Sequence, residues 1–209
     1  MYNLLCKIWQ FCDSIKDRLF RKNCDFSTWI IPKELEGNEE KGNKYQPSTD
    51  NLKKVLKKMN VSNKDSIIDI GCGKGKALYM MSKFPFRKIS GFDLSEDLIK
   101  IAKNNMNKLG LKNVNVFVAD ASDYKDYDDY NFFYIFNAIP EKVFNMAIKN
   151  IKKSIDRKPR KCSFIYLNPV YDDAVKKIGF KEFYNYKSII RWFNYRCYTI
   201  EEGDLNEKD

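Results

Sequence analysis

The stretch Ser66–Leu78, SIIDIGCGKGKAL, places three glycines at alternate positions between an apolar run and a helical run. Residues 66–70 are typical of a buried strand, and residues 75–84 are typical of a helix that stops before Pro85. A glycine-rich turn between a strand and a helix allows a ligand to approach the backbone closely. The stretch therefore predicts an α/β fold with a ligand site at the end of its first strand.

Strands and helices continue to alternate along the rest of the chain. The expected strands after the first are residues 88–94, 113–120, 130–137, 162–168, 182–190 and 195–202. The expected helices are residues 50–59, with Asp50 as the N-cap, and then 95–110, 141–155 and 172–178. This order predicts a Rossmann-like, doubly wound, mostly parallel seven-stranded sheet with helices on both faces.

The N-terminal residues form an amphipathic segment before this domain. Apolar residues recur at helical spacing between Leu4 and Leu19, and Lys7, Lys16, Arg18, Arg21 and Lys22 lie opposite them. The segment is either a helix packed on the main domain or a partner chain, or a peripheral membrane contact through residues 1–22. The polar stretch 33–44 is typical of a linker, so we expect an N-terminal helical appendage and linker over 1–44 and the main domain over 45–209.

The bulk composition limits the class of protein. The 209 residues are 44% hydrophobic and 15% aromatic, which is enough for one folded domain. The net charge of +10 indicates either attraction to nucleic acid or lysines spread over solvated faces. The basic run RKPRK (157–161) either contacts phosphate or forms a solvated turn. The acidic run DYKDYDDY (123–130) either guides a basic substrate or forms an exposed loop.

The chain has no histidine and six cysteines without a CxxC pair. The cysteine spacing fits reduced thiols in a cytoplasm, and we expect no metal site. Without histidine, Ser-His-Asp and Cys-His nucleophile systems are excluded. Any proton transfer must therefore use a carboxylate, Lys, Tyr, Cys or water. No apolar stretch reaches the roughly 20 residues that span a bilayer, so we expect a cytoplasmic protein.

The residues around the glycines discriminate between nucleotide ligands. A Walker loop ends in Gly-Lys-Ser/Thr, which is missing, and Lys76 stands where a dinucleotide fingerprint has its third glycine. Asp69, just before the glycines, favours a cationic ammonium over a pyrophosphate. Asp93, after the second strand, can accept hydrogen bonds from ribose hydroxyls, and Asp120, after the third, can accept one from an adenine amino group. Ammonium, ribose and adenine together describe S-adenosylmethionine.

The motifs IIDIGCGKG, GFDLS, VFVADA and FFYIFNAIP, in this order, resemble those of the class I, seven-β-strand S-adenosylmethionine-dependent methyltransferases. The resemblance covers roughly residues 45–200 and implies both the activity and the cofactor. The residues that it implies for cofactor binding are Asp69, Gly71, Cys72, Gly73, Gly75, Asp93, Leu94, Asp120, Ala121 and Asn137. We expect Cys72 to be a small residue within the turn and not a nucleophile.

A narrower resemblance concerns the methyl acceptor. YQPSTDNLKKVL, GKGKAL and PRKCSFIYLNP are similar to a bacterial methyltransferase group that resembles the seven-strand protein lysine methyltransferases. In that group an aromatic–x–Pro–Ser/Ala–Thr stretch helps to close over the cofactor, which implies binding roles for Tyr45 and Thr49. The alternative is a polar turn and helix cap. The resemblance implies an amine on a protein, such as lysine, as the acceptor.

The segment NAIP (137–140) follows the fourth predicted strand, where the family faces the methyl group. Enzymes that methylate amino groups of nucleic acids carry Asn/Asp-Pro-Pro-Tyr/Phe there, and this chain keeps only Asn137, which argues against adenine methylation. The candidate catalytic residues are Asn137, Pro140 and Glu141. Phe133, Tyr134 and Phe136 are candidate aromatic walls, although strand alternation assigns at least half of them to the core. An RNA or DNA methyltransferase and a non-catalytic S-adenosylmethionine-binding module remain as alternatives.

Overall fold

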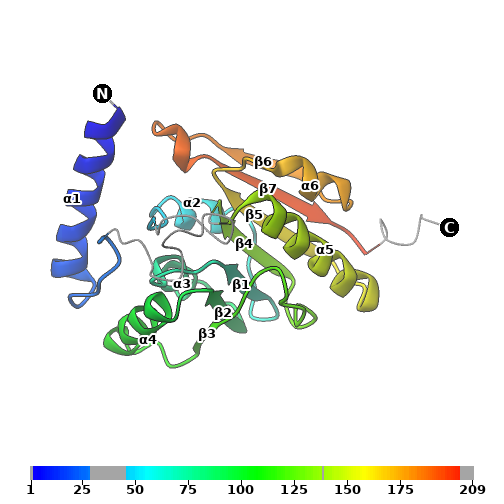
Figure 1. Ribbon diagram of the computed structural model, residues 1–209, viewed down its shortest axis with the longest axis horizontal. Helices are drawn as coiled ribbons and strands as arrows, with labels where there is room; N and C mark the ends of the chain where they lie inside the picture. Colours follow the sequence, from blue (N-terminus) through cyan, green and yellow to red (C-terminus); the bar gives the residue numbers. More distant parts are fainter. Residues whose placement is uncertain (1, 29–45, 138, 203–209) are drawn as a thin grey trace.

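The computed structural model describes residues 2–28, 46–137 and 139–202. A seven-stranded sheet with the order β3-β2-β1-β4-β5-β7-β6 forms its centre (Figure 1). Its strands are β1 (Ser66–Ile70), β2 (Lys88–Asp93), β3 (Val114–Val118), β4 (Phe132–Phe136), β5 (Cys162–Leu167), β6 (Lys181–Tyr186) and β7 (Tyr195–Ile200). Strands β3, β2, β1, β4 and β5 pair in parallel, whereas β7 is antiparallel to both β5 and β6. The predicted doubly wound sheet is confirmed.

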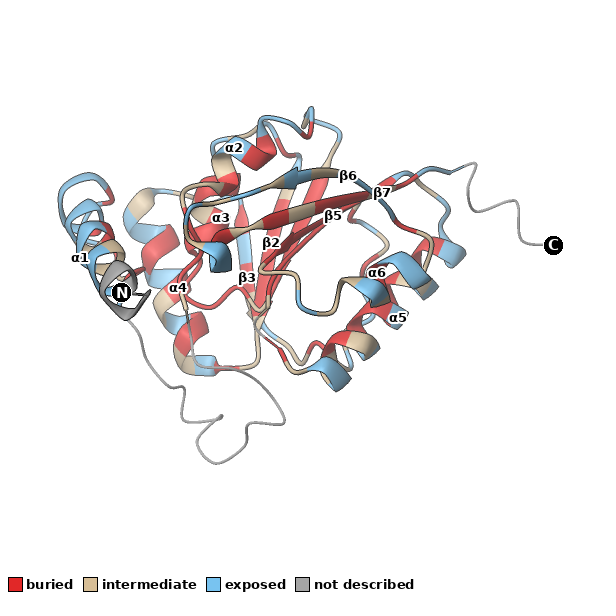
Figure 2. Ribbon diagram, turned by 90° about the horizontal axis from the view of Figure 1, so that it is seen from above, coloured by how far each residue is buried: buried red, intermediate tan, exposed pale blue. Residues whose placement is uncertain are grey.

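Helices cover both faces of the sheet, as predicted. They are α1 (Tyr2–Phe20), α2 (Leu52–Leu56), α3 (Lys76–Met81), α4 (Glu96–Leu109), α5 (Glu141–Arg157) and α6 (Asp172–Lys177), with a 3-10 turn at Arg191–Phe193. Helices α2, α3 and α4 share one hydrophobic core with the sheet, and α5 and α6 share the other. Figure 2 shows the buried strands between these two layers.

The central strands are largely apolar because both faces of the sheet are covered. Every residue of β1, β4 and β5 is buried, which explains why these strands are apolar without alternation. The connection from β3 to β4, all of which is described, contains no helix. Its Tyr124 and Tyr127 instead pack together and against Phe92 and Phe133 of the sheet. Aromatic side chains thus cover the part of this face that a helix would cover.

Helix α4 is capped as the sequence predicts, and α2 is not. The Ser95 hydroxyl accepts a hydrogen bond from the Leu98 N–H, and Gly110 ends α4 in a left-handed conformation. The predicted N-cap of α2 is wrong, because Asn51 occupies that position. The Asp50 carboxylate instead pairs with Lys16 and Arg21 of the N-terminal segment.

The basic run 157–161 and the acidic run 123–130 are partners of each other. Arg157 pairs with Asp128, and the guanidinium of Arg160 donates to the carbonyls of Tyr127 and Tyr130. The basic run lies beside the amino ends of the parallel strands, whereas ligands bind at the carboxyl ends of such sheets. The acidic run crosses from one edge to the other: its Tyr124 packs on Phe92 near the end of β2, and its Asp128 pairs with the basic run. The structure therefore favours the structural interpretation of both runs over contact with phosphate or with a basic substrate.

The N-terminal segment packs on the main domain. Trp9 lies against Phe193, with 4.8 Å between the ring centroids, and the buried Cys24 and Phe26 belong to the core that contains α3 and α4. Arg21 is buried, so it is not part of a free basic face as the sequence indicated. The boundary expected near residue 45 lies outside the described residues and stays a prediction. Among the described residues, no helix is both long and apolar enough to cross a membrane.

Candidate active site

The glycine-rich turn is held against β2 by backbone hydrogen bonds. The N–H groups of Gly71 and Cys72 both donate to the carbonyl of Phe92, at 2.9 and 2.8 Å. Gly71, Gly73 and Gly75 have φ values of 77°, 52° and 82°, a left-handed conformation that residues with a side chain rarely adopt. The alternate spacing of the glycines is therefore a requirement of the turn itself. It brings the turn to the carboxyl edge of the sheet, between β1 and β2.

The Asp93 carboxylate, at the end of β2, is oriented by two backbone amides. The Gly73 N–H donates to its Oδ2 at 2.9 Å, and the Ser95 N–H donates to its Oδ1 at 3.0 Å. The side chain is half-buried, as is that of Leu94, which follows it. The glycine turn and the second acid therefore form one unit, in which the backbone of the turn fixes the direction of the carboxylate.

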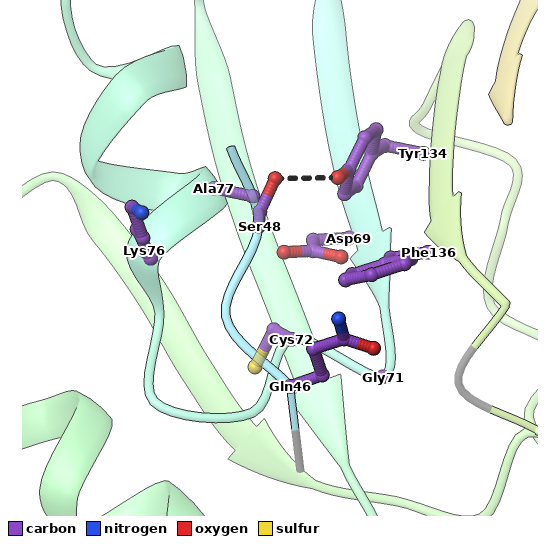
Figure 3. A pocket seen from close by; sticks show the side chains of 9 residues that line it. All are labelled: Gln46, Ser48, Asp69, Gly71, Cys72, Lys76, Ala77, Tyr134 and Phe136. Carbon is purple, nitrogen blue, oxygen red and sulfur yellow. Dashed lines mark hydrogen bonds between the residues drawn. The ribbon is translucent and has the colours of Figure 1, made fainter. Parts of the chain in front are cut away.

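Asp69 lies deeper, at the end of β1 (Figure 3). It is 1% exposed, and its Oδ2 has no hydrogen-bond partner among the described residues. Burial, reinforced by the negative charge of Asp93, raises the pKa of Asp69 well above its ordinary value. A buried carboxylate oxygen without a partner is costly, so the site favours a ligand that brings a positive charge or a proton.

A recess opens over Asp69. It is lined by Gln46, Ser48, Asp69, Gly71, Cys72, Lys76, Ala77, Tyr134 and Phe136. Tyr134 and Phe136 are two residues apart on β4, so both point to this side, whereas Phe133 belongs to the core with α5. Two of the three aromatics thus line the recess, more than strand alternation predicted, and their role as walls of an acceptor site stays a prediction. Burial raises the pKa of the Cys72 thiol well above its usual value, which disfavours the thiolate that a nucleophile needs. The role of Cys72 as a small residue within the turn stays a prediction.

The stretch before α2 contributes Gln46 and Ser48 to the lining of the recess, and Ser48 is the Ser/Ala position of the motif. Ser48 forms a hydrogen bond of 2.8 Å with the Tyr134 hydroxyl, and Gln46 lies further along the recess, beside Cys72 (Figure 3). The Thr49 hydroxyl accepts from the Asn51 N–H, which is the turn-capping alternative. Tyr45 lies outside the described residues. Cofactor contact by Tyr45 and Thr49 stays a prediction, while Gln46 was missed because only its neighbours matched the motif.

The third acid begins a tight turn after β3. Asp120 accepts hydrogen bonds at its Oδ1 from the N–H and the hydroxyl of Ser122, at 2.8 and 2.7 Å. Its carbonyl accepts from the N–H groups of Asp123 and Tyr124. Ala121, next to it, is buried. The parallel pairing of β1, β2 and β3 places Asp69, Asp93 and Asp120 along one edge of the sheet.

The fourth and fifth strands end in asparagines at the same edge. Asn137 follows β4, and the Tyr166 hydroxyl lies 3.5 Å from its Oδ1. Burial raises the pKa of Tyr166, which keeps the hydroxyl protonated. Asn168 follows β5 in a left-handed conformation with φ of 53°, and the pairing of Phe136 with Leu167 brings the two asparagines side by side. Asn168 was missed as a candidate, although the Asn-Pro after an apolar strand marks it.

The other two candidate catalytic residues lie at the start of α5. Pro140 is the N-cap of this helix, and Glu141 is its first residue, with an exposed side chain. Ala138, between Asn137 and these residues, lies outside the described part of the chain. Among the described side chains, no group of three or more His, Cys, Asp or Glu is placed to hold a metal ion.

Two buried lysines of the glycine turn bind the N-terminal segment. Lys74 Nζ pairs with Asp25 at 2.8 Å and also donates to the Thr28 carbonyl. Lys76 Nζ pairs with Asp13 at 2.5 Å and lies over the Trp9 ring. Burial lowers the pKa of Lys76 in spite of the nearby Asp13. The sequence indicated a helical appendage, and the structure shows that this segment contacts the glycine-rich turn directly.

Arg21 holds the same segment together. Its guanidinium pairs with Asp13 at 3.0 Å, Asp17 at 2.8 Å and Asp50 at 2.8 Å. The only sequence signal for this arrangement was the pair of acids at positions 13 and 17, one helical turn apart. We refer to Asp13, Asp17, Arg21 and Lys76, with Lys74 and Asp25, as the N-terminal ion cluster.

Comparison with known proteins identifies the fold and the family. A family model described as a methyltransferase domain matches residues 61–164. A probable cobalt-precorrin-6B C(15)-methyltransferase (decarboxylating) of Methanococcus vannielii is 31% identical over 133 residues, which are 63% of this chain and 68% of that protein. The chain belongs to the class I S-adenosylmethionine-dependent methyltransferases. The predicted family, activity and cofactor are thereby confirmed.

Other relatives of this methyltransferase act on different molecules. EEF1A lysine methyltransferase 2 of Danio rerio is 32% identical over 65 residues, which are 31% of this chain and 28% of that protein. Among solved structures, an S-adenosylmethionine-dependent methyltransferase from Aquifex aeolicus has a TM-score of 0.56 at 18% identity, covering 82% of this chain and 99% of the other. A mutant of MtNAS in complex with S-adenosylmethionine has a TM-score of 0.56 at 16% identity, covering 72% and 60%.

The residues of this methyltransferase fit its cofactor on structural grounds. The partnerless Oδ2 of the buried Asp69 matches a ligand that carries an ammonium group. The amides that orient Asp93 leave its carboxylate at the mouth of the same turn. The glycines keep the backbone free of side chains at the point of closest approach.

Proposed function

We propose that this methyltransferase transfers the methyl group to an amine nitrogen of a protein side chain, such as lysine. The observation that carries the proposal is the pair of carboxamides, Asn137 and Asn168, beside the aromatic wall of Phe136. A carboxamide oxygen accepts a hydrogen bond from a neutral amine without adding a charge. A lysine methyltransferase among the relatives supports the same acceptor class.

The cofactor-binding roles belong to the same proposal. Asp69 pairs with the ammonium group, Asp93 accepts from the ribose hydroxyls, and Asp120 with Ala121 receives the adenine. Gly71, Gly73 and Gly75 allow the close approach, with Cys72 and Leu94 beside them. When bound, S-adenosylmethionine supplies an electrophilic methyl group. The protein then supplies alignment, which is the main requirement of an in-line displacement.

The residues near the acceptor position an amine and do not deprotonate it. Tyr166 remains protonated because burial raises its pKa, and its hydroxyl keeps the carboxamide of Asn137 in place. Glu141 is the first residue of α5, and its side chain is exposed. We propose that the amine loses its proton to solvent before it enters. The initial rate at low amine concentration should then rise tenfold per pH unit up to the pKa of the amine.

A nucleic-acid acceptor has less support. The RKPRK run, the sharpest basic feature of the sequence, is engaged with the carbonyls and carboxylates of the chain itself. It lies at the opposite edge of the sheet from Asn137. The basic run that favoured RNA or DNA as a substrate therefore does not lie at the candidate active site.

Two measurements test the proposal. In calorimetry, S-adenosylmethionine should bind the wild type, and Asp93→Ala should weaken binding at least about tenfold, roughly 1.4 kcal/mol. In a cell extract with methyl-labelled cofactor, label should enter the protein fraction and appear in methylated lysine after hydrolysis. Asn137→Ala should lower incorporation at least about tenfold without changing cofactor affinity, whereas Asn185→Ala, on the edge strand β6, should leave both unchanged.

The outcomes separate the alternatives. Label in the RNA or DNA fraction would contradict the protein acceptor and establish a nucleic-acid methyltransferase. Cofactor binding without transfer to any fraction would indicate a non-catalytic binding module. Failure of the wild type to bind the cofactor would overturn the roles given to Asp69 and Asp93.

A further inference from the structure

Helix α1 presents its apolar face to solvent and its charged face to the protein. Ile8, Phe11, Ile15 and Leu19 are 50%, 66%, 40% and 66% exposed, and their spacing places them on one side of the helix. The opposite side holds the buried Asp13, Asp17 and Arg21. A surface helix normally buries its apolar stripe, so α1 is inverted. Figure 2 shows its outer side exposed.

The ion pairs explain why the helix keeps this orientation. Rotating α1 to bury the apolar side would expose Lys76, Arg21 and their partners or leave them buried without a counter-charge. The apolar stripe is thus held outward by the N-terminal ion cluster. A contiguous exposed apolar stripe of this kind marks an interaction surface.

The rim of the stripe carries only positive charge. Lys7 and Arg18 lie on one side of it and Lys16 on the other, and all three side chains are exposed. Lys16 also pairs with Asp50. Both acids of α1 face inward. A second copy of the chain would bring two cationic rims together, which disfavours self-association. An anionic surface matches both the stripe and its rim.

A second apolar projection stands beside the helix. The connection from β6 to β7 carries Ile189, which is fully exposed, and Trp192, which is 48% exposed. The contact of Trp9 with Phe193 joins this connection to α1, and Figure 1 shows the two together. Arg191, between the two apolar residues, is exposed. Tryptophan beside basic residues suits the interface between lipid and water.

We propose that the exposed side of α1, with the tip of the β6–β7 connection, binds the surface of an anionic lipid bilayer. The helix lies in the plane of the interface, with Phe11, Ile15 and Leu19 among the acyl chains and Lys7 and Arg18 at the headgroups. Ile189 and Trp192 insert beside it. The protein rests on the membrane and does not span it.

Vesicle co-sedimentation of the full chain tests this surface. The wild type should sediment with vesicles of phosphatidylcholine and phosphatidylglycerol, far less with phosphatidylcholine alone, and progressively less as salt is added. The double variant Phe11→Ser, Leu19→Ser should reduce the bound fraction at least about tenfold. Lys7→Glu with Arg18→Glu should remove the preference for the anionic lipid. Met146→Ser, which removes an exposed apolar side chain from α5, is the matched control and should bind like the wild type.

Calorimetric binding of S-adenosylmethionine to each variant confirms that it is folded, since none of the substituted residues lines the cofactor recess. Sedimentation of the stripe variant equal to that of the wild type would overturn the proposal. So would a wild type that binds neither kind of vesicle. A dimer in light scattering that Phe11→Ser dissociates, without vesicle binding, would assign the stripe to a second copy and equally overturn it.

Discussion

Two groups of ion pairs stand at opposite edges of the sheet and differ in their exposure to solvent. In the N-terminal ion cluster the side chains of Asp13 and Lys76 are each 1% exposed, whereas those of Lys88 and Asp129 at the amino edge are 37% and 62% exposed. Solvent screens the second pair and leaves it nearly neutral for stability. In the first, removal of one partner leaves a buried charge without compensation. Ion pairs thus hold the glycine-rich turn in place at one edge of the sheet, whereas at the other edge they lie on the surface and contribute little to stability.

The largest effect is expected at the centre of the buried cluster. Arg21→Met removes the partner of three carboxylates and should lower the free energy of unfolding by about 3–5 kcal/mol. Urea denaturation measures this loss. Arg18→Met, on the exposed side of the same helix, is the control and should change stability little. If Arg21→Met lowered the free energy of unfolding no more than the control does, the ion pairs of the cluster would contribute no more to stability than exposed pairs.

Removal of a complete pair should cost less than removal of half of it. Asp13→Leu and Lys76→Met should each destabilise the protein by about 3 kcal/mol, and the double variant by less than either. A double-mutant cycle in urea gives the coupling between the two side chains. Additive losses would show that the 2.5 Å contact contributes little.

Asp69 should separate stability from cofactor binding. Its folded pKa is raised, so the ligand-free native state binds a proton more tightly than the unfolded chain. Stability therefore falls as pH rises from the unfolded pKa through the folded one, and the loss is complete above that. Asp69→Asn should abolish this slope and raise the stability of the ligand-free protein at neutral pH. It should also weaken the binding of S-adenosylmethionine at least about tenfold, which corresponds to 1.4 kcal/mol.

Melting temperatures with and without cofactor, measured across the pH range, check both halves of this expectation. Asp126→Asn, which removes an exposed carboxylate from the connection between β3 and β4, supplies the comparison. A variant that loses stability and affinity together would show that Asp69 acts in packing instead of charge recognition.

The smallest effect is expected at the amino edge. Asp129→Asn breaks its pairs with Lys88 and Lys158 and should change the free energy of unfolding by no more than about 1 kcal/mol. Added salt should shrink even this difference. A larger loss of stability that persists at high salt would show that the amino-edge pairs contribute as much as the buried ones, and the two edges would then not differ.

The cofactor edge could be predicted because its information is local. Asp69 and Asp93 lie at the ends of β1 and β2, the glycines and Asp120 follow β1 and β3 within a few residues, and parallel strands bring their carboxyl ends together. The acceptor side could be predicted only in part. Asn137 was marked by its motif, while its contact with Tyr166 depends on the pairing of β4 with β5.

The N-terminal ion cluster could not be predicted from the sequence, for a different reason. Lys76 and Asp13 are 63 residues apart, and nothing in either neighbourhood indicates the other. The apolar stripe of α1 was also misleading. An amphipathic helix that packs on a domain is expected to bury its apolar side, whereas α1 exposes it. Packing of the helix was anticipated, but the face by which it packs was decided by charges distant in sequence.

The distance between those charges has a consequence for synthesis. Residues 7–28 leave the ribosome well before their partners Lys74, Lys76 and Asn105. Until then the acids of α1 have no lysine to receive them, and the helix cannot dock. The N-terminal segment therefore reaches its final place only after residues up to Asn105 have been made, and the glycine turn acquires its outer support at the same stage.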